Sequence, residues 1–184
     1  MRVFLISNMF PSKNDPLFGV FVKNFKTELE KQGAIFTKLS LIKGKSNSSI
    51  RKTLNYIRHY FSSIKNYMSG NYDIIYIHYL THHIPLLILF NFRKNKIIIN
   101  SHGSDIIGLQ KNAVLNYLAK YTLKKCHLLI VPTSYFKTKV LEYYPFLNSE
   151  KIFISPSAGI ESDKFYLLNE KIISNKEEKI KSSL

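Results

Sequence analysis

Three consecutive isoleucines at residues 97–99 lead directly into a short polar loop that contains a glycine. Because the run does not alternate apolar with polar residues, it predicts a strand that is covered on both faces, as in a parallel α/β sheet. Such sheets bind ligands at the carboxyl ends of their strands, where His102 and Asp105 lie. The imidazole can titrate or hydrogen-bond near neutral pH, and Gly103 lets the backbone approach a ligand. Alternatively, the loop is a structural turn whose acidic or hydroxyl side chain caps the next helix.

The remaining chain alternates short apolar runs with longer amphipathic segments, and their connections are too long for β-hairpins. This alternation predicts a doubly wound parallel sheet of Rossmann-like α/β type with right-handed crossovers. We expect strands at residues 3–7, 34–42, 72–77, 97–99, 128–131 and 151–155. We expect helices at residues 20–32, 50–68, 86–92, 114–121 and 136–144. Residues 1–168 thus form one domain, and residues 169–184, rich in Lys, Glu, Ser and Asn, form a charged tail or the start of an interdomain linker.

Apolar spacing assigns a packing face to each predicted helix. For two of the shorter helices the expected faces are Val20, Phe21, Phe25 and Leu29, and Val114, Leu115, Leu118 and Tyr121. The longest helix carries one apolar stripe, formed by Ile50, Leu54, Ile57, Phe61, Ile64 and Met68. Its other faces interleave tyrosines with Arg51, Lys52, Arg58, His59 and Lys65. Either the stripe packs on the sheet and the cations are solvated, or the basic helix lies on an anionic membrane.

A loop rich in turn-forming residues follows the first strand and leads to Gly19, where the first helix begins. An exposed backbone amide at a helix start, together with the helix dipole, forms a natural phosphate site. Gly19 is therefore a candidate phosphate-binding residue. The alternative is that the glycine only permits a tight turn into the helix.

Three histidines, His78, His82 and His83, follow the third strand. No carboxylate or cysteine accompanies them at the spacing of a metal site, so we expect no bound metal. A loop at this position can instead line a ligand cleft. The first strand is not followed by a Gly-x-Gly-x-x-Gly fingerprint, which argues against a dinucleotide oxidoreductase, and the sequence has neither a Walker loop nor a Gly-x-Ser-x-Gly elbow.

The composition restricts the partners and the compartment of the protein. The formal net charge of +15 favours nucleic acid, an anionic membrane or a phosphate-bearing ligand, although abundant lysine can also serve solvation alone. Cys126 is the only cysteine, which excludes an intramolecular disulfide and fits a reducing cytoplasm. The apolar run at the N-terminus is too short for a signal peptide. The run at residues 84–90 is broken by Pro85 and is far shorter than the roughly 20 residues that span a bilayer.

Four separated segments together resemble the amino-terminal half of GT-B glycosyltransferases of family 4. They are residues 3–11 with 19–22 and 29–33, residues 102–105, residues 131–134 and residues 156–165. The resemblance implies transfer of a sugar from a nucleotide-sugar donor to an acceptor, with retention at the anomeric carbon and with neither an obligate metal nor a cofactor. It also implies that this half of the GT-B fold holds the acceptor and faces the donor domain across a cleft.

The same resemblance implies roles for individual residues. The amide of Gly19 would contact the donor phosphates. His102 would lie beside the transferred sugar as a catalytic residue. Asp105 would also belong to the catalytic residues, and its role would be to steady the loop. The cleft would be lined by Gly103, Ser104, Ser157 and Gly159. Two positions depart from the family pattern, because Phe18 stands where a second glycine is frequent and Ala158 replaces the usual asparagine.

The donor domain of the family, which follows in the carboxy-terminal half, has no counterpart in this sequence. We therefore expect the acceptor-side domain of a hexosyltransferase-type enzyme that does not turn over nucleotide sugars alone. The expected acceptor is a glycan or glycolipid of cell-envelope polysaccharide synthesis, and the expected location is the cytoplasm, peripheral on the inner face of the cell membrane. The alternative is a non-catalytic binding subunit that partners a separate donor-domain polypeptide, or a truncated relic. Nucleic-acid binding rests on the charge alone and is not expected, because no recognised motif is present.

Overall fold

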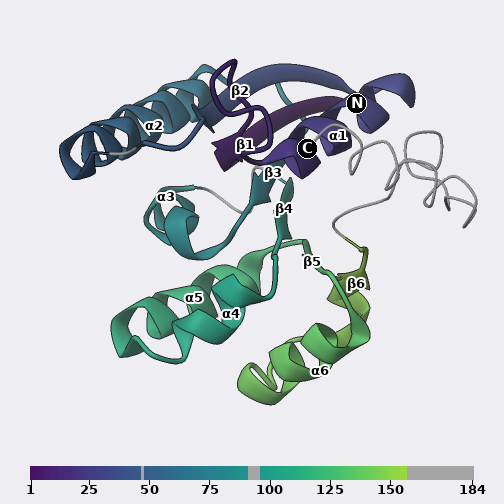
Figure 1. The fold of residues 1–184 in the computed structure, drawn as a ribbon. Coiled ribbons are helices and arrows are strands. Elements are labelled where there is room, and N and C mark those ends of the chain that lie inside the picture. The colour runs from purple at the N-terminus through teal and green to yellow at the C-terminus, as the bar shows by residue number, and fades with distance from the viewer. Residues whose placement is uncertain (47, 91–95, 157–184) are drawn as a thin grey trace, which may run out of the picture.

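In the computed structural model of the protein, the described residues are 1–46, 48–90 and 96–156. Their strands form one six-stranded sheet in the order β2-β1-β3-β4-β5-β6, and all neighbouring pairs are parallel (Figure 1). The strands are β1 (Arg2–Phe10), β2 (Ile35–Lys43), β3 (Ile74–His78), β4 (Lys96–Asn100), β5 (Leu128–Val131) and β6 (Ile152–Ile154). The predicted doubly wound parallel sheet is thereby confirmed.

Helices connect the strands and lie on both sides of the sheet (Figure 1). They are α1 (Val20–Lys31), α2 (Ser49–Ser69), α3 (Ile84–Leu89), α4 (Ser104–Leu109), α5 (Ala113–Lys125) and α6 (Ser134–Tyr143), with short 3-10 turns η1 (Thr81–His83) and η2 (Ser149–Lys151). Helix α1 packs on one face of the sheet, whereas α2, α3 and α5 pack on the other. None of the described helices is long and apolar enough to cross a bilayer.

The isoleucine run of β4 contributes to both faces of the sheet, as its lack of alternation predicted. Ile97 and Ile99 are fully buried among residues of α3 and α5, and Ile98 packs on the opposite side with the residues around α1. Successive side chains of a strand point to opposite faces, so three apolar residues in a row require cover on both. The strand is therefore held in the middle of the sheet.

The strand order changes direction next to β1. The chain passes from β1 to β2 at one edge and then returns to place β3 on the other side of β1. At such a topological switch point the connections that leave neighbouring strands diverge to opposite faces and open a crevice for ligands. The register aligns the carboxyl ends of three central strands, because Ser7 pairs with His78, and His78 pairs with Asn100.

Two of the predicted packing faces are partly wrong. In α1 the fully buried residue is Val22, whereas Val20 is 37% exposed. In α5 the buried residues are Ala119, Thr122 and Leu123, whereas Val114 is 69% exposed and Tyr121 also reaches solvent. The rest of both predicted faces packs against the core, namely Phe21, Phe25 and Leu29 of α1 and Leu115 and Leu118 of α5.

The packing interpretation of the long helix is also wrong. Helix α2 turns His59 and Ser63 toward the protein, with Tyr60, Ile64 and Tyr67 packed beside them. These polar groups have partners within the fold, since the hydroxyl of Ser63 donates to the carbonyl of His59 (2.8 Å) and the hydroxyl of Tyr60 donates to the carbonyl of His82 (2.7 Å). Of the apolar stripe expected on the sheet, only Ile64 packs against the core.

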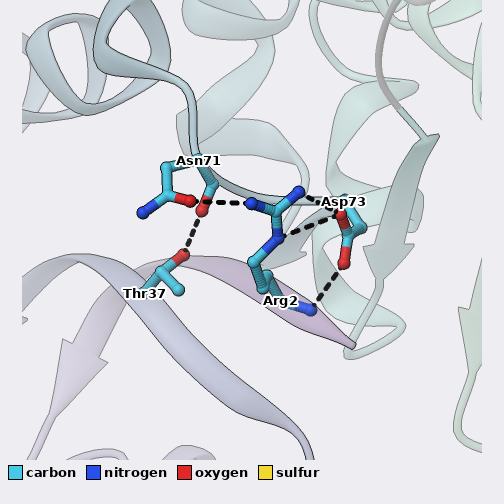
Figure 2. Close-up of polar contacts among 4 residues, drawn as sticks. All are labelled: Arg2, Thr37, Asn71 and Asp73. Atoms are coloured by element: carbon cyan, nitrogen blue, oxygen red, sulfur yellow. Dashed lines mark hydrogen bonds and ion pairs between the residues drawn. The ribbon is translucent and has the colours of Figure 1, made fainter.

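Polar contacts fasten the amino-terminal end of the sheet, opposite the carboxyl ends of the strands (Figure 2). Arg2, at the start of β1, donates to the carboxylate of Asp73 from its guanidinium (2.7 Å) and from its backbone N–H (2.8 Å). The guanidinium also donates to the side-chain oxygen of Asn71 (2.7 Å). The backbone carbonyl of Asn71 accepts from the hydroxyl of Thr37 (2.7 Å) on β2. The Arg2 guanidinium lowers the pKa of Asp73 to about 2. These contacts tie β1 and β2 to the segment that enters β3.

Candidate functional site

Gly19 lies buried at the N-terminus of α1, directly after the loop that leaves β1. Its backbone is left-handed, with φ of 69° and ψ of 28°. A Cβ atom at this position would lie 2.6 Å from the carbonyl carbon of Met9 and 2.8 Å from the backbone nitrogen of Phe10. Both features exclude a side chain. The fold of the loop therefore explains the glycine without a ligand, and the phosphate role remains a prediction.

Replacing Gly19 by alanine is expected to lower the free energy of unfolding by about 2–4 kcal/mol, because strain at positive φ adds to the overlap with the backbone of β1. Gly33 is the matched control, since it has a φ of 84° but a Cβ atom there would have no neighbour within 4 Å. Its replacement by alanine should show the conformational strain alone, about 1 kcal/mol. Urea unfolding measures both. Equal losses in the two variants would show that the approach to Met9 adds nothing.

The buried carboxylate of Asp105 organises the loop after β4. One oxygen accepts from the hydroxyl of Ser101 (2.7 Å) and from the backbone N–H groups of His102 (3.1 Å) and Ile106 (3.2 Å). The other accepts from the backbone N–H of Leu80 (2.7 Å), which belongs to the segment after β3. Asp105 thus fixes the shape of its own loop and joins the exits of two neighbouring strands.

His102 lies in a group of rings contributed by three elements. Its imidazole contacts Phe21 of the first turn of α1, with ring centroids 4.7 Å apart. On β3, the ring of His78 stacks near it, and His78 Nδ1 lies 3.5 Å from His102 Nε2, the outer limit of a hydrogen bond. Burial lowers the pKa of His102, and the nearby Asp105 carboxylate opposes this effect. The arrangement favours a neutral, half-buried imidazole that can exchange hydrogen bonds with a ligand.

A second pair of histidines is buried behind this group. His59 Nε2 of α2 lies 3.0 Å from His83 Nε2, and His83 Nδ1 lies 2.7 Å from the carbonyl oxygen of Tyr79. A carbonyl only accepts, so Nδ1 of a neutral His83 carries the proton and its Nε2 accepts from His59. His59 Nδ1 is then unprotonated, and it is buried without a hydrogen-bond partner among the described residues. Burial lowers the pKa of His59 to about 4 and that of His83 to about 3.

Tyr79 is a site feature that the sequence did not reveal. It has a φ of 72°, a conformation that is rare and strained for a bulky side chain. Its ring stacks on that of His82 (centroids 5.2 Å apart) and lies 6.1 Å from that of His102. The backbone strain is compatible with the fold because hydrogen bonds hold the segment: the N–H of Tyr79 donates to the carbonyl of Asn100 (3.0 Å), and the N–H of Leu80 donates to Asp105. No pattern of residue types in the sequence predicts a positive φ at a tyrosine.

The sequence of the chain matches the profile of one protein family. Its profile, described as glycosyl transferase 4-like, matches residues 20–133, from the first residue of α1 to just beyond the end of β5. The chain belongs to this glycosyl transferase 4-like family. No curated protein matches the chain. The matched span contains the exit of β3 and the loop of His102 and Asp105, whereas Gly19 immediately precedes it.

The structure places the remaining predicted residues of the glycosyl transferase 4-like domain as follows. Gly103 is buried at a φ of 86°, and a Cβ atom there would overlap the ring of Phe136 from α6. Ser104 is exposed at the first position of α4. Ser157 and Gly159 lie outside the described residues. Gly103 and Ser104 therefore accompany His102, and the placement of the other two is not described.

Four of the six histidines form two pairs, His59 with His83 and His78 with His102, and they do not gather around a common point. In the part of the chain that the structure describes, no three or more His, Cys, Asp or Glu side chains are grouped so as to hold a metal ion. The polar atoms at the carboxyl ends of β1 and β3 instead offer hydrogen bonds. His78 Nε2 and Asn8 Oδ1 are buried without partners among the described residues.

Proposed function

We propose that this glycosyltransferase domain forms the acceptor side of a retaining enzyme that moves a sugar from a nucleotide-sugar donor to a glycan or glycolipid acceptor. The observation that carries the proposal is the convergence of the exits of β1, β3 and β4 on His102 at the switch point of the sheet. Phe21 brings the first turn of α1 to the imidazole, and Asp105 ties the segment after β3 to the same loop. Three elements are thus held around one half-exposed polar group.

The residues have distinct roles in this proposal. The neutral imidazole of His102 hydrogen-bonds a hydroxyl of the transferred sugar or stabilises charge at the reacting centre. Asp105 acts as a positioning residue, because its oxygens are occupied by groups of the protein. The N-terminal turn of α1, which has no side-chain cap and no acidic residue, receives the donor phosphates at Gly19. Neither a metal nor a cofactor takes part in this proposal.

Acceptor binding tests the role of His102. A panel of glycans and lipid-linked saccharides is expected to contain ligands that bind the 184-residue chain. Binding of these ligands should be lost in the His102→Ala variant. The matched control is His127→Ala, because His127 is exposed and precedes β5 at the opposite end of the sheet. Equal binding by the two variants would contradict the proposed site.

The 184-residue polypeptide is expected not to turn over a nucleotide sugar. Catalysis by positioning requires both reactants at reacting distance, and the groups around His102 organise only one side of the cleft. Calorimetry with uridine and guanosine diphosphate sugars should show dissociation constants no tighter than the millimolar range, and a hydrolysis assay should show no product. Micromolar donor binding with turnover would contradict the assignment of this domain to the acceptor side.

A non-catalytic binding subunit that acts with a separate donor-domain polypeptide is the second candidate. It shares the acceptor site with the first candidate and differs in where the donor groups are encoded. The coding sequence that continues beyond these residues, or lies next to them, distinguishes the two. For either candidate we propose a location on the cytoplasmic side of the membrane and a product that is a cell-envelope polysaccharide.

A further inference from the structure

Helix α2 carries an exposed apolar stripe along its outer side. Ile50 is 76% exposed, Phe61 71% and Met68 76%, and Leu54 and Ile57 between them are also exposed. These residues recur at intervals of three, four and seven, so they form one continuous band on the helix. Single exposed apolar residues are ordinary on a protein surface, whereas a contiguous band of five indicates a contact surface.

A row of cations runs beside this apolar stripe. Arg51, Arg58 and Lys65 recur every seven residues, and all three side chains are exposed. Each follows or precedes a stripe residue by one to four positions, so the basic row borders the stripe along the length of the helix. Helix α2 contains no Asp or Glu in its 21 residues. The outer side of the helix is therefore both apolar and positively charged.

The other side of α2 is occupied by the protein. His59 and Ser63 are buried, and the helix packs against β2, β1 and α3. Figure 1 shows α2 at the outer edge of the helix layer that also contains α3 and α5. The hydrogen bond between His59 and His83 and that between Tyr60 and the carbonyl of His82 fix the rotation of the helix. The stripe is thus held outward by buried polar contacts.

We propose that α2 docks on an anionic lipid surface, with the stripe in the boundary between headgroups and acyl chains and the basic row on the headgroups. An interfacial helix needs an apolar face for insertion and cations for attraction to anionic lipid, and α2 presents both on its exposed side. A second copy of the chain fits less well. Pairing two α2 stripes would bring two basic rows together without an acidic partner, and like charges in contact repel.

The position of α2 also relates the docking surface to the candidate site. Tyr56, six residues after the start of the stripe, contacts the ring of His82 (centroids 5.4 Å apart) and accepts a hydrogen bond from Asn8 Nδ2 (3.3 Å). The amino-terminal half of α2 therefore adjoins the loops that leave β1 and β3. A docked α2 holds these loops close to the lipid surface, and the docking itself does not depend on the proposed function.

Co-sedimentation with lipid vesicles tests the proposal on the 184-residue chain. The chain is expected to bind vesicles that contain phosphatidylglycerol about tenfold more tightly than vesicles of phosphatidylcholine alone, and high salt should abolish most of the difference. The Ile57→Ser/Phe61→Ser variant should lose insertion, and the Arg58→Glu/Lys65→Glu variant should lose the preference for anionic lipid. Both variants change exposed side chains, so the fold should be retained.

Helix α5 offers matched control variants. Val114 and Tyr117 are as exposed as the stripe residues, and Lys120 and Lys124 are exposed cations. Val114→Ser/Tyr117→Ser and Lys120→Glu/Lys124→Glu should bind vesicles almost as the unmodified chain does. Three outcomes would overturn the proposal: negligible binding to both vesicle types, equal loss in the α2 and α5 variants, or a dimer in solution that the Ile57→Ser/Phe61→Ser variant dissociates. The last would assign the stripe to a second copy.

Discussion

Replacing Asp105 by alanine is expected to lower the free energy of unfolding by about 3–5 kcal/mol. The substitution removes the acceptor of Leu80 N–H, His102 N–H and the hydroxyl of Ser101, all in the buried loop after β4 or in contact with it. Each buried donor left without an acceptor is destabilising by about 1–3 kcal/mol. The N–H of Ile106 adds little to this loss, because it also donates to the carbonyl of Gly103 (3.1 Å). Urea unfolding at neutral pH measures the effect.

Two further variants separate the causes of this loss. Asp105→Asn keeps the shape of the side chain and one acceptor oxygen. Its amide nitrogen cannot accept and would face a donor that the second oxygen now bonds, so about half of the loss is expected. Glu142→Ala removes an exposed carboxylate that pairs with Lys139 on the surface of α6 and should change stability by less than about 0.5 kcal/mol. If Asp105→Ala were as stable as Glu142→Ala, the carboxylate would not hold the two segments together.

Much of the fold could be predicted from local sequence patterns. The run at residues 97–99 indicated a central strand because it lacks alternation, and a threonine directly before a helix, such as Thr133, is typical of a helix cap. In the structure the Thr133 hydroxyl accepts from the N–H of Phe136 (3.4 Å) at the start of α6. Gly19 was expected at the start of the first helix, and α1 begins at the next residue. These features depend on residues close in sequence, which is why the patterns reveal them.

The packing faces and the site network could not be predicted in the same way. Helical periodicity shows that α2 has an apolar side, but it does not show which side meets the sheet. That choice depends on His83 and His82, which bond His59 and Tyr60 from a segment more than 20 residues away. The contact between Asp105 and Leu80 likewise spans 25 positions. Long-range hydrogen bonds of this kind are specified by the fold rather than by any local pattern.

Acidification is expected to destabilise the domain strongly, because three buried histidines must remain neutral in the folded state. Burial lowers the pKa of His59 to about 4 and the pKa values of His78 and His83 to about 3, from an ordinary value of 6.5. The neighbours of the His59–His83 pair are Tyr60, Tyr79 and His82, and the neighbours of His78 include His102 and Tyr76. Among the described residues, no carboxylate pairs directly with any of the three buried histidines.

The direction of the pH effect follows from proton binding. Between pH 6.5 and the lowered pKa values, the unfolded chain binds protons that the folded chain does not, so the free energy of unfolding falls as the pH falls. Each histidine contributes about 1.4 kcal/mol per pH unit, and three together give a slope of about 4 kcal/mol per unit. Above pH 6.5 their neutral forms predominate in both states and the stability is fully present.

Urea unfolding at about pH 7, 6 and 5 measures this slope, and a loss of about 4–6 kcal/mol is expected over the two units. His59→Gln keeps a donor for His83 Nε2 and removes one titrating group, so the slope should fall by about one third. His127→Gln is the matched control, because His127 is exposed and burial opposes its charge less. A free energy of unfolding that stays constant from about pH 7 to 5 would show that the folded domain accommodates the imidazolium ions, contrary to the burial of the His59–His83 pair and of His78.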